Sequence, residues 1–233
     1  MRKLVLWDID GTLIRCGKSP RNAIVAAMEE VFGTRGDVDN YPFSGKTDPQ
    51  IIYDVMTAAQ MDEQHVLANM HVALAGYVAR LEKTLMPDEI RIFEGIVDLL
   101  NQLSGHNEVI QGLLTGNVIE GARIKLSRAG LGHYFFNGKP PLGAFGSDAR
   151  HRPELPAIAV QRAWEMTGRR FESKDIVIIG DSPYDVLCGK HLNVRSIAVA
   201  TGWHSVEDLK PYEPDAVYTD FSDTSDVLKT ILA

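Results

Sequence analysis

Two aspartates separated by one residue follow a short apolar run near the start of the chain. The run from Leu4 to Trp7 is apolar throughout. Asp8 and Asp10 come directly after it, ahead of Gly11. Two carboxylates this close repel each other. We therefore expect either a cation that neutralises them or a reaction in which one of them takes part. The pair therefore indicates either a divalent metal site or acid–base chemistry at the end of a buried strand.

A second acidic cluster follows another apolar run. Asp181 and Asp185 come after residues 176–179, within the stretch GDSPYD. Together with the first pair they form a group of acids that is costly to hold without a cation. Oxygen-only ligand sets suit Mg²⁺, which keeps several waters and binds one or two carboxylates plus a substrate phosphate. The expected Mg²⁺ ligands are Asp8, Asp10, Asp181 and Asp185.

A third polar cluster has the composition of an anion site. Thr115, Gly116 and Asn117 stand between the apolar run at 109–114 and a segment with helical spacing. A hydroxyl group and free backbone N–H groups at the start of a helix form a site for an anion. Asn117 is also a candidate for the N-terminal cap of that helix, in which case Thr115 faces the ligand.

A phosphate held beside several carboxylates needs a basic residue. Arg150, His151 and Arg152 lie together in the chain, and the residues alone do not choose among them. Lys125 and Lys139 are alternative sources of the charge. At least two of Arg150, His151 and Arg152 are expected on the solvated surface, where most charged residues lie.

The elements that must position these clusters alternate between strands and helices. This alternation implies parallel βαβ units with right-handed crossovers. In such sheets ligands bind beyond the carboxyl ends of the strands, so the polar clusters should converge at one edge. The expected strands are 4–7, 109–114, 176–179, 196–199 and 216–218, and the expected helices between them are about 94–103, 118–129 and 154–166.

Residues 15–88 differ from the rest, because their apolar residues recur at helical spacing only. Ser19 and Asp48 are each followed by proline and are expected as N-terminal caps, with Thr47 as an alternative to Asp48. A third helix is expected from about 62 to 85. The fold class is therefore α/β, a doubly wound (Rossmann-like) parallel sheet core with an inserted small all-helical cap domain. The expected domains are a catalytic core of residues 1–14 and 89–233 and a helical cap of residues 15–88.

The overall composition narrows the class of partner. The net charge is -7 with no basic stripe, so nucleic acid is not expected as a partner. No apolar run approaches the roughly 18 residues of a membrane span, so no membrane partner is expected. The cysteines, Cys16 and Cys188, form no CxxC pair, which fits a reducing cytoplasm. A small molecule is the expected partner, and the sequence does not indicate the oligomeric state.

Taken together, the clusters resemble the haloacid dehalogenase (HAD) superfamily over nearly the whole chain. Residues 8–12 match its DxDGT motif, Thr115 its second motif, and residues 180–185 its GDSxxD motif. Its third motif is usually a lysine before proline, and Arg152 stands at the matching position. Arginine keeps the charge and adds a bidentate fork. The helical insert resembles the small helical cap of the phosphoglycolate phosphatase and β-phosphoglucomutase branch.

The resemblance implies a Mg²⁺-dependent phosphatase that hydrolyses a small phosphate monoester through an aspartyl-phosphate intermediate. Asp8 would attack phosphorus, and Asp10 would protonate the leaving oxygen and then deprotonate the incoming water. Mg²⁺ would be held by Asp8, the backbone carbonyl of Asp10 and Asp181, with Asp185 orienting the group. The residues expected to bind the phosphoryl oxygens are Thr115, Gly116, Asn117 and Arg152.

Other activities are compatible with parts of this motif set. A phosphotransferase or phosphomutase acting on a sugar phosphate shares every motif and differs only in the acceptor of the phosphoryl group. A dehalogenase would use Asp8 but has little need of Asp10, and a phosphonate hydrolase needs a cap lysine, for which Lys18 and Lys46 are the candidates. A binding protein on an inactive enzyme fold is disfavoured by the intact acids.

Substrate choice is expected to depend on the loop at 43–48, which joins two cap helices. In this branch the equivalent loop closes over the core site and meets the leaving group of the substrate. Gly45 would permit a close approach, and Lys46 would supply a charge. Two interpretations of Lys46 carry equal weight: it binds a second anionic group of the substrate, or it lies in solvent.

Overall fold

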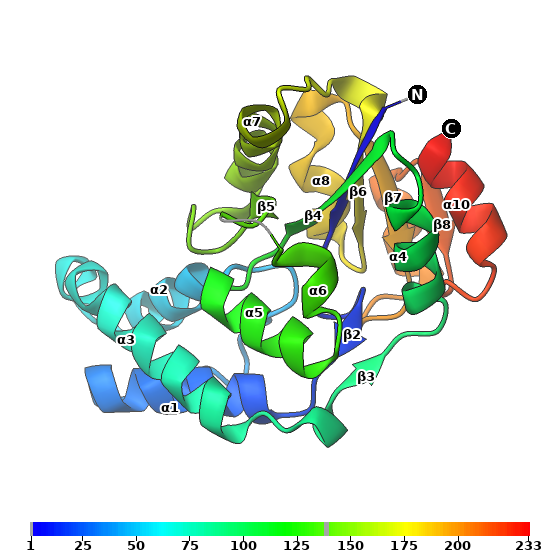
Figure 1. Ribbon diagram of the computed structural model, residues 1–233. Coiled ribbons are helices and arrows are strands. Elements are labelled where there is room, and N and C mark those ends of the chain that lie inside the picture. The colour runs from blue at the N-terminus through cyan, green and yellow to red at the C-terminus, as the bar shows by residue number, and fades with distance from the viewer. Residues whose placement is uncertain (1, 138–139) are drawn as a thin grey trace.

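A parallel β-sheet forms the centre of the computed structural model, which describes residues 2–137 and 140–233 (Figure 1). The chain runs outward from the middle strand in both directions, and all neighbouring strands are parallel. This confirms the predicted doubly wound α/β sheet. In sheet order the strands are β5 (Gly143–Ala144), β4 (Val109–Leu114), β1 (Lys3–Trp7), β6 (Ile176–Gly180), β7 (Arg195–Val199) and β8 (Ala216–Tyr218).

Helices cover both faces of this sheet, which explains why its central strands are apolar runs rather than alternating patterns. Val5 and Trp7 of β1 pack on one face, and Leu4 and Leu6 on the other. Among the described residues, no helix is both long and apolar enough to cross a membrane. One face carries α4 (Ile96–Ser104), α5 (Ile119–Arg128), α6 (Gly132–Phe135) and α10 (Thr224–Leu232), the other α7 (Leu155–Thr167) and α8 (Pro183–Cys188), and α9 (Val206–Leu209) follows β7.

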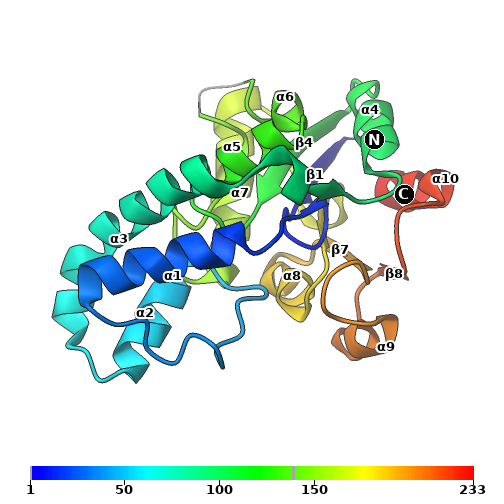
Figure 2. The same ribbon diagram turned by 90° about the horizontal axis from the view of Figure 1, so that it is seen from below.

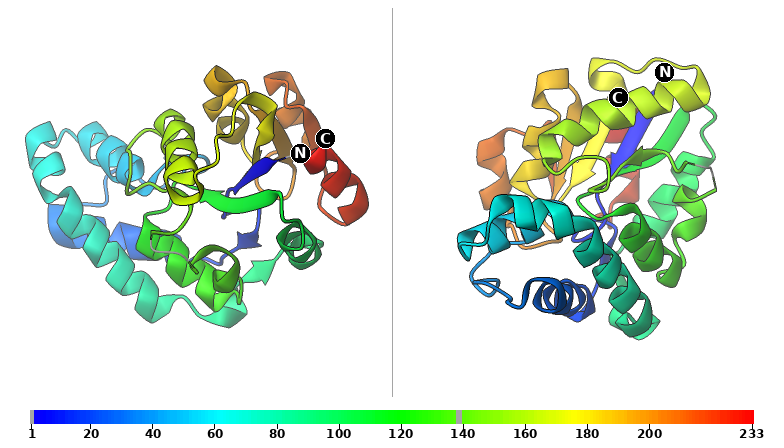
Figure 3. Two further views of the ribbon diagram at one scale, coloured as in Figure 1. Left: turned by 45° about the horizontal axis from the view of Figure 1, so that its top comes forward. Right: turned by 90° about the vertical axis from the view of Figure 1, so that its left-hand side faces the viewer.

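The inserted helices lie together, away from the sheet (Figure 2). Their buried side chains form a hydrophobic cluster of their own, joined by Val118 from the start of α5. The third of these helices passes beside α5 (Figure 3). The all-helical insert is thus confirmed as architecture, whereas its bounds at 15 and 88 stay a prediction. The helices are α1 (Ser19–Phe32), α2 (Asp48–Ala58) and α3 (Glu63–Thr84).

Two short strands mark the places where the chain leaves the sheet and returns to it. Ile14–Arg15 (β2) pairs antiparallel with Arg91–Ile92 (β3). The sequence did not predict this ladder, because strands of two residues have no hydrophobic period to detect. The ladder brings side by side the two chain segments that connect the insert to the sheet.

The predicted cap of the first inserted helix is wrong by one residue. Lys18 occupies the N-cap position of α1 without a side-chain bond, and Ser19 is already helical. The Ser19 hydroxyl instead donates to the Glu89 carboxylate at 2.6 Å. Ser19 is therefore used to join the start of α1 to the segment that follows α3.

The predicted cap of the second inserted helix is also displaced. Thr47, not Asp48, is the N-cap of α2, and its side-chain oxygen accepts a hydrogen bond from the Gln50 amide at 3.1 Å. The Asp48 carboxylate accepts from the Val118 amide at 2.8 Å. Because this amide belongs to the loop after β4, Asp48 fastens the insert to the sheet domain. Burial raises the pKa of Asp48 to about 6.

Candidate active site

Three aspartates meet at the carboxyl ends of neighbouring strands β1 and β6. Asp8 follows β1, Asp181 follows β6, and Asp185 lies in the first turn of α8. One carboxylate oxygen from each lies within 4.8 Å of the others, and all three residues are buried. Gly11 has φ +89°, and a Cβ there would overlap the Asp181 carboxylate. The glycine of DxDGT is therefore needed for the close approach of the two loops.

The charge of this cluster is only partly neutralised by protein groups. Burial raises the pKa of Asp8 to about 7, against the opposing effect of the Arg152 guanidinium. Burial also raises the pKa of Asp181, and the neighbouring Asp185 and Asp8 carboxylates raise it further. Like charges in a buried site favour the protonated forms of these acids. A divalent cation at the cluster would remove this penalty.

Arg152 is the basic residue that the fold brings to the cluster. It lies in a 3₁₀ turn (Arg152–Glu154) before α7 and is 3% exposed. Its Nη2 donates to Asp8 Oδ1 at 3.1 Å and also bonds Asp185 Oδ1. The structure thus distinguishes among the three adjacent basic residues, which the residue types alone did not, and the one at the cluster is the residue that matches the third motif. A buried arginine that bonds two carboxylates is typical of sites where anions are held in fixed orientation.

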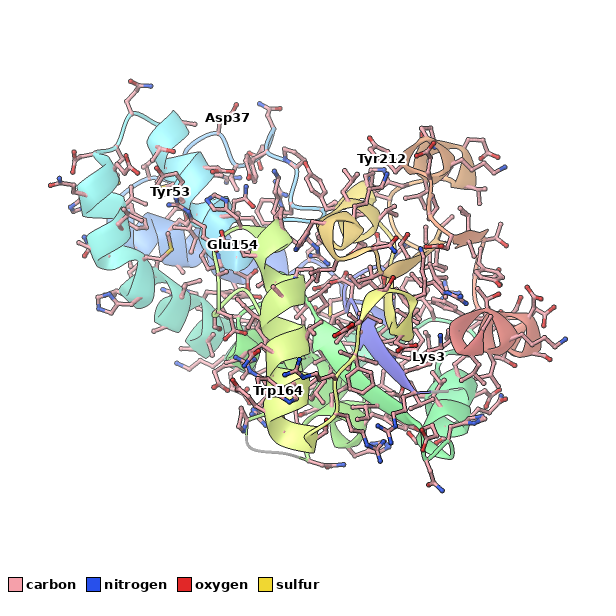
Figure 4. The ribbon with its side chains drawn as sticks, turned by 90° about the horizontal axis from the view of Figure 1, so that it is seen from above. Lys3, Asp37, Tyr53, Glu154, Trp164 and Tyr212 are labelled. Carbon is pink, nitrogen blue, oxygen red and sulfur yellow. The ribbon has the colours of Figure 1, made fainter. Side chains whose placement is uncertain are left out.

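The other basic candidates lie elsewhere. The Arg150 guanidinium stacks over the ring of Tyr53 on α2, 3.7 Å from its centroid. Figure 4 labels Tyr53 on α2 and Glu154 near the start of α7. His151 is exposed. Lys139, an alternative source of charge, lies outside the described residues. Arg150 therefore connects the insert to the sheet domain and does not contact the acidic cluster.

The hydrogen bonds of Asp185 are suited to orienting Arg152 and the start of α8. Its Oδ2 accepts hydrogen bonds from the Ser182 amide at 3.0 Å and the Ser182 hydroxyl at 2.6 Å, and its Oδ1 accepts from Arg152. These bonds hold the first turn of α8 as a capping box. Because each oxygen already has a partner, Asp185 is better placed to fix Arg152 and the start of α8 than to donate a full ligand bond to a cation.

The Asp10 carboxylate is not part of the group formed by Asp8, Asp181 and Asp185. Its Oδ2 accepts from Lys125 Nζ at 2.7 Å and from Asn117 Nδ2 at 2.7 Å. Burial is the largest single effect on Lys125 and lowers its pKa, but the Asp10 carboxylate and the other acidic groups around it together raise the pKa above its usual value. The metal-sized cluster within the described residues consists of Asp8, Asp181 and Asp185, without the Asp10 carboxylate. A contribution of Asp10 to a metal would therefore have to come from its backbone carbonyl.

Lys125 is the site residue that the sequence signalled most weakly, as one alternative source of charge. A usable signal was present, since Val118 and Ala122 precede Lys125 at spacings of seven and three residues on α5. These spacings place all three on one helix face, and the first two are buried. A lysine on the buried face of a helix needs an acidic or carbonyl partner, which indicates a specific role.

The loop at 115–117 differs in part from the anion site that was predicted. Asn117 is not the helix cap: Val118 is, and the Asn117 side chain bonds Thr115 Oγ1 at 2.8 Å as well as Asp10. The amides of Val118 and Ile119 are taken by Asp48 and Ser147. The start of α5 is thus satisfied largely by protein groups, and the fully buried Thr115 keeps its hydroxyl proton to donate.

The loop at 43–48 packs directly on the core motifs. Gly45 has φ +71°, and a Cβ there would overlap the ring of Tyr184, inside the GDSPYD stretch. Lys46 is partly buried, with Nζ 4.7 Å from the Tyr184 ring centroid. A Cβ on Gly116 would likewise overlap the Lys46 carbonyl. The sequence did not single out Tyr184, which supports the loop through this cation–π contact.

Similarity to known proteins is distributed over the full chain. A probable phosphatase, IndB, from Dickeya dadantii is 24% identical over 96% of this chain and 92% of its own length. A predicted phosphoglycolate phosphatase from Haemophilus somnus shares the fold with a TM-score of 0.67 at 18% identity, covering 97% of each chain. A candidate β-phosphoglucomutase from Bacteroides vulgatus gives a TM-score of 0.69 at 17% identity, covering 99% of this chain and 89% of the other.

The family model described as haloacid dehalogenase-like hydrolase matches residues 5–199. This span begins in β1 and ends with β7, so it contains the acidic cluster, Thr115 and Arg152 together with the helical insert. The motifs from which the resemblance was predicted lie inside it. On this match and this geometry, the chain belongs to the family of haloacid dehalogenase-like hydrolases.

Proposed function

We propose that this hydrolase is a Mg²⁺-dependent phosphatase of a small phosphate monoester, acting through an aspartyl phosphate formed on Asp8. The observation that carries the proposal is the environment of Asp8. Its carboxylate lies at the end of β1, within 4.8 Å of two other acids, and bonds Arg152 at 3.1 Å. The proposed nucleophile, Asp8, thereby lies next to the proposed phosphate-binding group, the Arg152 guanidinium.

The proposed chemistry assigns one role to each of these side chains. Asp8 attacks phosphorus, the bond to the leaving oxygen breaks, and Asp10 gives that oxygen a proton. Water then attacks the phosphorus of the aspartyl phosphate while Asp10 takes a proton from it. The bond between phosphorus and the Asp8 oxygen breaks, which restores the Asp8 carboxylate and releases inorganic phosphate. Arg152 and the Thr115 hydroxyl donate to the phosphoryl oxygens during both steps. Fixed donors of this kind contribute about 3–4 kcal/mol each to transition-state stabilisation.

The acidic cluster is suited to a divalent cation of the Mg²⁺ type. Its donor atoms are all carboxylate oxygens, and two of its acids have raised pKa values that a cation would lower. Asp8, Asp181 and the Asp10 carbonyl would hold the ion, with Asp185 orienting the group. When bound, the ion neutralises negative charge between the phosphate and Asp8. Hard oxygen ligands and a phosphate substrate favour Mg²⁺ over softer metals.

Turnover of p-nitrophenyl phosphate and of a panel of small phosphate monoesters tests the activity. The protein should release phosphate with added Mg²⁺ and lose this activity in EDTA, with recovery when Mg²⁺ is restored. Undiminished activity in EDTA would overturn the metal requirement. Absence of turnover on the whole panel with Mg²⁺ present would overturn the phosphatase assignment.

Acid-quench trapping tests the covalent step. Asp10→Asn should still be phosphorylated by p-nitrophenyl phosphate, whose leaving group needs no proton, but should hydrolyse the intermediate slowly. Phosphate label should therefore accumulate on Asp10→Asn and be absent from Asp8→Asn. Label of equal amount on both variants would exclude Asp8 as the nucleophile.

The acceptor of the phosphoryl group separates hydrolysis from transfer. In ¹⁸O-water, a phosphatase incorporates one ¹⁸O into each inorganic phosphate released. A phosphotransferase or phosphomutase on a sugar phosphate would instead move the phosphoryl group to a sugar hydroxyl without ¹⁸O. Product that is mainly a second sugar phosphate would replace the proposed hydrolase activity by this alternative.

A further inference from the structure

Lys125 is a buried charge in the middle of helix α5, 4% exposed. Its Nζ has two acceptors, Asp10 Oδ2 at 2.7 Å and Asn117 Oδ1 at 2.6 Å. Burying an ammonium group costs several kcal/mol unless good partners offset it. A leucine or methionine at this position of the helix would pack without that cost. We therefore look for the role of the Lys125 ammonium group in its effect on the two acceptors, Asp10 and Asn117.

Both acceptors belong to loops that follow strands of the sheet. Asp10 comes after β1, and Asn117 after β4. The Asn117 amide bridges them, since Nδ2 donates to Asp10 Oδ2 at 2.7 Å and Oδ1 accepts from Lys125. Lys125, Asn117 and Asp10 thus form a closed triangle of hydrogen bonds. Such a triangle leaves the Asp10 carboxylate little freedom of rotation.

The two carboxylate oxygens of Asp10 differ in their hydrogen bonding. Oδ2 accepts from two donors, whereas for Oδ1 no donor is found in residues 2–137 and 140–233. The side chain as a whole is 43% exposed. A proton on Asp10 therefore belongs on Oδ1, because a proton on Oδ2 would compete with the donors already present. The oxygen that can exchange a proton with a substrate is the one to which neither Lys125 nor Asn117 donates.

We propose that Lys125 is a positioning residue that fixes the Asp10 carboxylate with Oδ1 toward the leaving group. This rests on the proposed function, in which Asp10 is the acid and base. In the first step the Oδ1 proton passes to the leaving oxygen as the P–O bond breaks. In the second, Oδ1 takes a proton from the water that attacks the aspartyl phosphate. Lys125 does not touch the substrate and keeps its own protons throughout.

The position of a general acid strongly affects its contribution. The acid must lie within about 2.6–3.2 Å of the oxygen that it protonates, and general acid–base catalysis contributes about 10²–10⁴-fold. A misplacement of about 1 Å can cost about 10²-fold. The effect should depend on the leaving group, because a good leaving group departs without a proton. A phosphate-binding lysine would instead affect all substrates alike.

The test is the dependence of kcat/KM on leaving-group pKa in the wild type, Lys125→Met, Lys125→Gln and Lys125→Arg. Arg123→Met is the control on the same helix, with a side chain 42% exposed at position 123. Lys125→Met and Lys125→Gln should lose about 100-fold on an alkyl phosphate and less than about fivefold on p-nitrophenyl phosphate. Lys125→Arg should recover part of this loss, and Arg123→Met should follow the wild-type dependence.

A uniform loss on every substrate, or no loss on any, would overturn the positioning role. Whichever of Lys125→Met and Lys125→Gln folds, as judged by its Tm, is sufficient for this comparison. Crystals of that variant provide a readout that does not need activity: the Asp10 carboxylate should leave the wild-type orientation. An unchanged Asp10 orientation would overturn the proposal. Wild-type protein that hydrolyses no phosphate ester would instead overturn the proposed function, and the crystal comparison would still decide the positioning role.

Discussion

The Arg152 guanidinium donates to Asp8 Oδ1 at 3.1 Å, and the two side chains are 3% and 10% exposed. The same Nη2 bonds Asp185. Breaking a buried ion pair by removing one partner typically costs about 3–5 kcal/mol, because the other charge is left uncompensated. Arg152 therefore has two separable effects, one on folding and one on the phosphoryl oxygens, and the variants below are chosen to separate them.

Arg152→Ala should reduce kcat/KM by about 10²–10³-fold, the usual effect of removing a fixed donor to a transition state. Arg150→Ala and His151→Ala should stay within a few-fold of the wild type, since neither side chain contacts the acidic cluster. Arg152→Lys should retain more stability and more activity than Arg152→Ala. Steady-state kinetics and Tm measured together on the four variants provide the check. Equal mild losses in Arg150→Ala, His151→Ala and Arg152→Ala would contradict the assignment to Arg152.

Asp8→Asn should lose nearly all turnover while the fold is kept. The amide is a poor nucleophile, yet it has the shape of the carboxylate and carries no charge to bury. Phosphate release and circular dichroism are the measurements. Asp88→Asn, at an exposed residue of the segment after α3, is the matched control and should remain fully active. Activity near that of the wild type in Asp8→Asn would exclude covalent catalysis through this residue.

The pKa of Asp8 predicts how Mg²⁺ and pH act on stability. Its value is raised in the folded state from 3.8 to about 7, so the unfolded chain ionises first. The metal-free fold should therefore lose stability from this group as the pH rises from about 4 to 7. Mg²⁺ binds the ionised carboxylate, so its stabilising effect should grow over the same window and be complete above pH 7.

Thermal unfolding at pH 5.5 and pH 8, with and without Mg²⁺, checks this dependence. A ligand at 100 times its Kd stabilises by about 2.7 kcal/mol, or roughly 5–10 °C for a chain of this size. The shift should be clearly larger at pH 8 than at pH 5.5. Shifts of equal size at the two pH values would mean that Asp8 is not part of the metal site.

Lys46→Ala tests whether the loop at 43–48 selects substrates. If Lys46 binds a second anionic group, the variant should raise KM about tenfold for a substrate that carries one, since a hydrogen bond to a charged group contributes about 1.5–3 kcal/mol. Hydrolysis of p-nitrophenyl phosphate should change little. Lys83→Ala, an exposed lysine on α3, is the control. Parallel losses on both substrates would assign Lys46 to phosphate binding or to packing of the loop on Tyr184.

The sequence determined the architecture and the identity of most site residues because these depend on local patterns. Apolar runs and helical spacing located β1, β4, β6 and α3 and the first residues of α1 and α2 to within a residue or two. The rule that ligands bind at the carboxyl ends of parallel strands then predicted that Asp8, Thr115 and Asp181 lie at one edge of the sheet. Strands of two residues, such as β2 and β5, were not found because they are too short to show a period.

Only the tertiary structure decided how charged side chains are paired. The residue types alone could not choose among Arg150, His151 and Arg152, because adjacent residues share one local context and differ only in what lies across the fold. The family motif singled out Arg152, but only the structure paired it with Asp8 and Asp185. The same holds for Lys125 and Asp10, which are 115 residues apart and meet because α5 and the loop after β1 pack together. Side-chain pairing of this kind depends on distances of a few ångströms between distant segments, and such distances exist only once the sheet and the insert have folded around them.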